Sequence, residues 1–167
     1  YDVAYCMAKD GHQVTVFCPS GSYVEGCEMV YFGEPINQVQ CNWFEEERKA
    51  INVVADRIMN DGYQIIHGMD WFGFEYDLKA RKPELHCTHT HHGGLNMDWW
   101  GKSKAPFPLN LIAISKWMQQ IYASLGFISR VVYNGIPIEE YPFKAEKGDR
   151  LLFVGRLDSF KRTHIAI

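Results

Sequence analysis

The chain has 167 residues, 47% of them hydrophobic, and a formal net charge of -3 at pH 7. This size allows one globular core, or one domain with a piece of another. A slightly acidic chain disfavours nucleic acid or an acidic lipid surface as the main partner, and no apolar run reaches the roughly 18 residues that a transmembrane helix needs. The five cysteines include no close CxxC pair. They indicate reduced thiols rather than a disulfide framework and predict a cytoplasmic protein.

Short apolar segments alternate with helical patterns along the first half of the chain. Residues 1–10 form a helical pattern that Gly11 ends. Residues rich in β-branched and aromatic side chains predict strands over 13–18 and 27–32. The clearest helix is predicted over 43–60. Its apolar face carries Phe44, Ile51, Val54 and Ile58.

The second half continues the same alternation. Its predicted elements are, in chain order, a strand over 63–67, a helix over 74–81, a strand that starts at Leu85, a strand over 109–114, a helix from Ser115 to Gly126 and a strand over 130–133. Parallel strands need crossover connections, so the alternation predicts an α/β fold with a Rossmann-like, doubly wound parallel sheet. Prolines and charges over 137–149 predict a linker, and 151–154 is expected to begin a new buried strand.

The stretch Leu85–Gly94 holds four of the seven histidines of the chain. Strand alternation places Cys87, His89 and His91 on one face of the sheet and His92 on the other. Ligands bind at the carboxyl ends of the strands in open α/β sheets. His91 and His92 are therefore the histidines best placed for chemistry.

A second candidate follows the strand predicted over 151–154. Gly155 and Arg156 come directly after it, and Lys161 stands where a helix is expected to begin. Backbone N–H groups and the helix dipole favour an anion at such a position, and a guanidinium with an ammonium suits a diphosphate. A solvated basic turn would account for the same pair. Its place just after a linker favours the phosphate interpretation.

Four short motifs resemble the family 4 glycosyltransferases, which are retaining enzymes with the GT-B fold. The motifs are Val154–Leu157 with Lys161, similar to the family's VGRL and lysine; Ile66–Trp71, similar to its HxHDW segment; Thr90–Gly93, similar to its TxHG strand end; and Val132–Ile136, similar to its vxNGv strand. The motifs fall in the order that the family has.

The resemblance implies two Rossmann-like domains that face a cleft. Residues 1–136 would form the N-terminal acceptor domain, 137–149 the interdomain linker and 150–167 the start of the nucleotide-sugar-binding domain. A helical pattern is already under way at Tyr1, and an apolar, helix-like segment has only begun where the sequence stops. We therefore expect a fragment that lacks its first strand and is inactive alone.

The resemblance also implies the site residues of a hexosyltransferase. His92 matches the histidine that faces the transferred sugar, with His91 as the alternative, while Arg156 and Lys161 match the residues that hold the leaving diphosphate. Further substrate contacts are expected from Asp70, Gly93 and Asn134, and stacking on a sugar or lipid from Trp71, Trp99 and Trp100. The nucleotide diphosphate sugar is a co-substrate, and neither a cofactor nor a metal is implied.

Several of these residues have structural interpretations as well. Asp70 could cap the helix after it, Asn134 could shape the turn before the linker, and the tryptophans could be packing anchors. Two positions depart from the family, because Arg162 stands where a glycine is usual and Pro137 where an aspartate is common. The implied partners are a nucleotide sugar and a sugar or lipid-linked acceptor, which leaves peripheral membrane contact and the oligomeric state open.

Two rival hypotheses remain. Cys87, His89 and His91 alternate on one strand face, and with Asp70 they could bind zinc in a metal-dependent hydrolase. This hypothesis leaves the turn that bears Lys161 unexplained. The other rival is a non-catalytic Rossmann-like binding domain.

Overall fold

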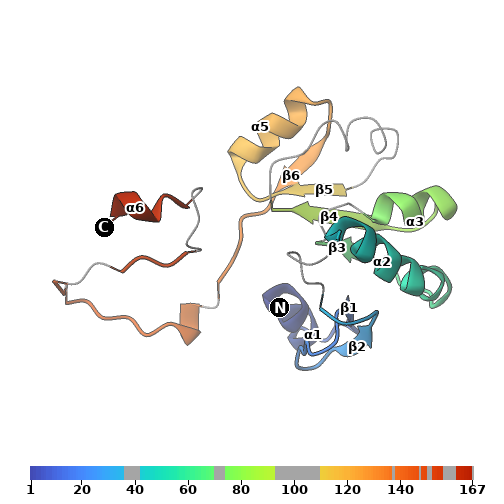
Figure 1. The fold of residues 1–167 in the computed structure, drawn as a ribbon, viewed down its shortest axis with the longest axis horizontal. Helices are drawn as coiled ribbons and strands as arrows, with labels where there is room; N and C mark the ends of the chain where they lie inside the picture. Colours follow the sequence, from blue (N-terminus) through green and yellow to red (C-terminus); the bar gives the residue numbers. More distant parts are fainter. Residues whose placement is uncertain are drawn as a thin grey trace. The chain divides into compact units, whose positions relative to one another are not determined.

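The computed structural model describes residues 1–35, 42–69, 74–92, 110–136, 138–146, 148–149, 152–155 and 161–166 (Figure 1). The chain divides into two compact units, Tyr1–Ile136 and Pro137–Ile167. Within the described ranges, no helix has both the length and the apolar character needed to cross a membrane.

Every strand pair that the structure describes is parallel. A two-stranded sheet joins β1 (Thr15–Cys18) to β2 (Glu28–Tyr31), and a four-stranded sheet has the order β3 (Ile66–Gly68), β4 (Cys87–His91), β5 (Asn110–Ala113), β6 (Ser129–Val131). β4 has a strand on each side, as Figure 1 shows. The predicted α/β fold with a Rossmann-like parallel sheet is confirmed.

The helices of the first unit that the structure describes follow the sequence pattern closely. They are α1 (Asp2–Lys9), α2 (Trp43–Asn60), α3 (Glu75–Arg81) and α5 (Lys116–Ser124). The bounds of α2 are those predicted. The predicted N-cap of α5 is also confirmed, because Ser115 Oγ accepts a hydrogen bond of 3.1 Å from the backbone N–H of Met118.

Two apolar clusters hold the helices against the strands. The first consists of Val54, Ala55 and Ile58 of α2, Leu78 of α3, Leu85, and Cys87 of β4. The second consists of Leu111 and Ala113 of β5 with Met118 and Tyr122 of α5. In the strand register, His89 lies beside Leu111 and His91 beside Ala113. Laterally paired residues of parallel strands share a face, so α2, α3 and α5 all pack on the face that carries these two histidines.

Two strands differ from their predicted bounds. β3 is Ile66–Gly68 rather than 63–67, and β6 is Ser129–Val131 rather than 130–133. The register explains the first difference, because Ile66 pairs with Cys87, the first residue of β4, and Ile65 is left 66% exposed. The apolar run predicted the existence of each strand, but the neighbouring strand determines where pairing begins and ends.

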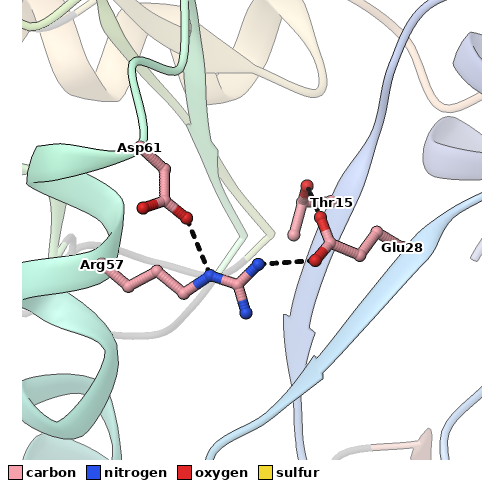
Figure 2. A network of polar contacts seen from close by, with 4 residues as sticks. All are labelled: Thr15, Glu28, Arg57 and Asp61. Atoms are coloured by element: carbon pink, nitrogen blue, oxygen red, sulfur yellow. Dashed lines mark hydrogen bonds and ion pairs between the residues drawn. The ribbon is translucent and has the colours of Figure 1, made fainter.

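A surface network links the two-stranded sheet to α2. Figure 2 shows Arg57 between Asp61, at the end of α2, and Glu28 of β2. Arg57 donates hydrogen bonds of 2.8 Å to Asp61 Oδ2 and 2.5 Å to Glu28 Oε1, and Thr15 Oγ1 of β1 donates one of 2.8 Å to Glu28 Oε2. The hydrogen bond from Thr15 and then that from Arg57 lower the pKa of the Glu28 carboxyl. The network therefore favours an ionised Glu28.

The second unit contains a 3₁₀ helix over Ile138–Glu140 and a short helix, α6, over Thr163–Ala166. The strand predicted over 151–154 is wrong for its described part, because residues 152–154 have no regular secondary structure. Leu152 and Val154 are 86% and 84% exposed. An apolar run becomes a buried strand only beside partner strands, and the described residues of this unit supply none.

Candidate functional site

The carboxyl ends of four parallel strands define one edge of the larger sheet. β3, β4, β5 and β6 end there at Gly68, His91, Ala113 and Val131. His92 follows β4 directly and Asn134 follows β6 by three residues; both residues are exposed. Two of the predicted site residues therefore lie at the edge where α/β sheets bind ligands.

The side chains of His91 and His92 have opposite surroundings. His91 is 2% exposed, and its ring stacks on that of His89 with centroids 5.7 Å apart. Its backbone oxygen lies 3.4 Å from the hydroxyl of Tyr122, which donates to it from α5. Because His91 belongs to the core and His92 is exposed, the geometry favours His92 as the residue that a ligand can reach.

The opposite face of β4 carries a polar contact to β3. His67 Nε2 and Thr90 Oγ1 are 2.8 Å apart in a hydrogen bond, and Thr90 is only 7% exposed. Partial burial of the ring lowers the pKa of His67, and the neighbouring charges of His89 and His92 lower it further. These contacts favour a neutral imidazole at His67, next to the site edge.

A buried carboxylate at the start of α3 was missed by the sequence analysis. Glu75 is 1% exposed, and its Oε1 and Oε2 atoms lie 3.3 Å and 3.2 Å from Nδ1 of His89, which is 0% exposed. A glutamate in the first turn of a helix is ordinary because it complements the helix dipole. The sequence signal that could have drawn attention to it is His89, on the same strand face as Cys87 and His91, because a histidine that becomes buried needs a polar partner.

The metal hypothesis is not favoured. In the part of the chain that the structure describes, no three His, Cys, Asp or Glu side chains gather in a way that could hold a metal ion. Burial raises the pKa of the Cys87 thiol to about 11, and the charge of Glu75 adds to this effect. Asp70, the fourth ligand of that hypothesis, lies outside the described residues.

The remaining predicted residues are divided between described and undescribed parts of the chain. Gly93, Arg156 and the tryptophans Trp71, Trp99 and Trp100 lie, like Asp70, outside the described residues. Lys161 is described and exposed. A Cβ atom built on Gly155 would lie 3.9 Å from Cγ of Lys161, so the lysine stem passes beside this glycine.

The backbone after Lys161 is unusual. Arg162 has a φ of 50°, in the left-handed region that favours glycine. This is the position where the sequence departs from the glycine of the resembled family. The turn thus keeps a glycine-like conformation at a residue that has a side chain.

Comparison with known proteins agrees with this architecture. The family model described as Glycosyltransferase Family 4 matches residues 1–140. A search of curated proteins finds no match. The matched residues include the motifs at 66–71, 90–93 and 132–136, and they cover more than half of the 167-residue chain. The chain therefore belongs to glycosyltransferase family 4 and carries a domain of enzymes that transfer a sugar from a donor to an acceptor.

Proposed function

We propose that this protein moves a hexose from a nucleotide diphosphate sugar to a hydroxyl acceptor, with retention of configuration, in a GT-B architecture. The observation that carries the proposal is the exposed position of His92 at the carboxyl end of β4, within the residues that match the family. A neutral imidazole there can hydrogen-bond a hydroxyl of the transferred sugar. The buried His91 supports the strand from inside the core.

The diphosphate in this proposal is held by Arg156 and Lys161. The lysine stem and the ring of Phe153 lie beside Gly155, where an added Cβ would come within 3.1 Å of that ring. Negative charge on the diphosphate grows as the glycosidic bond breaks, so an ammonium here stabilises the transition state more than the bound donor. Nucleotide sugar and acceptor are the partners, and a lipid-linked acceptor would add peripheral membrane contact in the cytoplasm.

The test is a transfer assay on the full-length enzyme with nucleotide diphosphate hexoses that differ in base and sugar. Release of nucleoside diphosphate measures turnover, and NMR of the product gives its anomeric configuration. His92→Ala should lower turnover strongly. His86→Ala is the matched control, because His86 is also exposed but precedes β4 at the opposite edge of the sheet.

The diphosphate role is tested by Lys161→Ala. Turnover should fall by roughly 100-fold with a smaller change in donor affinity, since the lost interaction belongs mainly to the transition state. Lys144→Ala is the control, because Lys144 lies in the same unit and its side chain is 81% exposed. An inverted product, or equal turnover in Lys161→Ala and the wild type, would contradict the mechanism.

A further inference from the structure

We infer that Glu75 and His89 form a buried positioning pair that fixes the carboxyl end of β4, and with it His92, for sugar binding. The inference rests on the proposed function, because it gives the pair a purpose in substrate positioning. Neither residue touches substrate in this scheme. Both act through the backbone and side chains of the strand.

The contact between Glu75 and His89 is short and buried. Glu75 is 1% exposed and His89 0% exposed, and both carboxylate oxygens lie within 3.3 Å of Nδ1 of the imidazole. Burying a carboxylate away from water is costly unless a donor or a cation meets it. The favourable state of this site is therefore the one in which His89 keeps its Nδ1–H directed at the carboxylate. That requirement fixes the orientation of the ring.

Gly68 makes the space for this carboxylate. A Cβ built on Gly68, the last residue of β3, would coincide with the Glu75 carboxylate group. Because Gly68 of β3 has no side chain, the carboxylate of Glu75 on α3 can lie against the imidazole of His89 on β4. Three elements therefore meet at one buried polar contact.

The pair lies two residues from the end of β4. The ring of His89 stacks on that of His91 at 5.7 Å with an interplanar angle of 30°, and His91 is the last residue of the strand. The backbone oxygen of His91 also accepts the hydroxyl of Tyr122. His91 is therefore held through its ring on one side and its backbone on the other. His92, the next residue, takes its direction from that fixed strand end.

A purely structural role would predict a different result from a positioning role. If the pair only stabilises the fold, its loss lowers the melting temperature and leaves the kinetics of the folded enzyme unchanged. If the pair positions His92, its loss moves the strand end. A displacement of about 1 Å at a substrate contact can cost roughly 100-fold in rate.

Glu75→Leu and Glu75→Gln test this difference in the full-length enzyme. Leucine has a similar size and removes the acceptor, whereas glutamine keeps an amide oxygen for the Nδ1–H of His89. We expect turnover to fall by roughly 10- to 100-fold in Glu75→Leu with the KM for the donor little changed, and to recover in large part in Glu75→Gln. Leu78→Ala is the control, since Leu78 is a fully buried residue of the same helix that packs in the apolar cluster. It should lower the melting temperature and keep the wild-type turnover.

Hydrogen exchange gives a readout that does not need activity. Glu75→Leu should speed the exchange of the backbone amides of His91 and His92, while the amides of α5 keep their wild-type rates. Absence of transfer by the wild type would refute the proposed function and leave this measurement to decide the positioning role. Wild-type exchange at both amides in a folded Glu75→Leu variant would overturn the inference.

A double substitution tests the part played by Gly68. Gly68→Ala should displace the carboxylate and Glu75→Ala should remove it, so each single variant should show a similar loss of turnover. When both substitutions are combined, the added methyl group no longer meets a carboxylate, so the defect should be no larger than that of Glu75→Ala alone. Additive defects would show that the two residues act separately and would contradict the shared contact.

Discussion

Two glutamates of the first unit contact nitrogen groups in opposite surroundings. Glu28 on β2 meets Arg57 at the surface, with side chains 55% and 41% exposed, whereas Glu75 on α3 meets His89 with side chains 1% and 0% exposed. Water and salt screen the first pair, so it contributes little to stability. The second pair has no such screening, because both of its side chains are buried away from water.

The sheets that carry these pairs differ in the same way. The strands of the two-stranded sheet contain no buried residue, whereas four of the five residues of β4 are buried. The candidate site lies at the end of β4, the strand whose residues are most buried. Rigid elements hold substrate contacts more accurately than exposed ones do, and this explains why the buried polar contact belongs to the site-bearing sheet.

The largest expected effect is the loss of the buried carboxylate. Glu75→Ala should lower the free energy of unfolding by about 3–5 kcal/mol, because it leaves the buried His89 without this partner. Denaturant-induced unfolding measures the effect, and Glu28→Ala is the exposed counterpart. If Glu75→Ala lowered the free energy of unfolding as little as Glu28→Ala does, the two pairs would not differ in their contribution to stability.

Local sequence patterns predicted most of the elements in the first unit. The apolar periodicity of α2 gave its bounds, and the N-cap residue Ser115 gave the start of α5. Both patterns act within a few residues of the chain, where the sequence is directly informative. Strand alternation likewise predicted that His89 and His91 share a face, which their stacked rings confirm.

The buried pair could not be predicted in this way. Glu75 and His89 are 14 residues apart and meet only because α3 packs on the sheet where β3 ends in a glycine. No pattern within one element encodes that meeting. The prediction of a strand over 151–154, which is wrong for the described residues 152–154, has a related cause, because an apolar run does not reveal whether partner strands are present.

A smaller effect is expected when the Tyr122 hydroxyl, which donates to the end of β4, is removed. Tyr122→Phe removes the hydrogen bond of 3.4 Å to the backbone oxygen of His91 and keeps the ring in the core. The free energy of unfolding should fall by about 1 kcal/mol, measured by denaturant-induced unfolding. Burial raises the pKa of the Tyr122 hydroxyl to about 12, so it remains a donor throughout the neutral range. A stability equal to that of the wild type would indicate that the backbone oxygen of His91 does not need this donor.

The pH dependence of stability should report His67, an exposed residue of β3 whose ring hydrogen-bonds the buried Thr90. Its pKa in the folded protein is lowered from 6.5, first by burial and then by the charges of His89 and His92. The unfolded chain therefore binds the proton more tightly. The stability contributed by a neutral His67 is fully present above about pH 6.5 and is lost as the pH falls through the folded-state value.

Thermal unfolding between about pH 8 and pH 5 measures this contribution by comparing the wild type with His67→Gln. On acidification, the melting temperature of the wild type should fall further than that of His67→Gln. Parallel pH profiles would show that the ring is as well solvated in the folded protein as in the unfolded chain.

The smallest effect is expected at the surface network of Figure 2. Glu28→Gln removes the charge and keeps one acceptor oxygen for Arg57, while its amide NH2 can donate to the hydroxyl of Thr15, and Arg57 retains its second contact with Asp61. Because all four groups are solvated, the melting temperature should change only slightly, and high salt should reduce even that change. The same salt series applied to Glu75→Gln should leave its difference from the wild type unchanged, since ions do not reach the buried pair. The contrast between the two glutamates would be reversed if the melting-temperature change of Glu75→Gln depended on salt and that of Glu28→Gln did not.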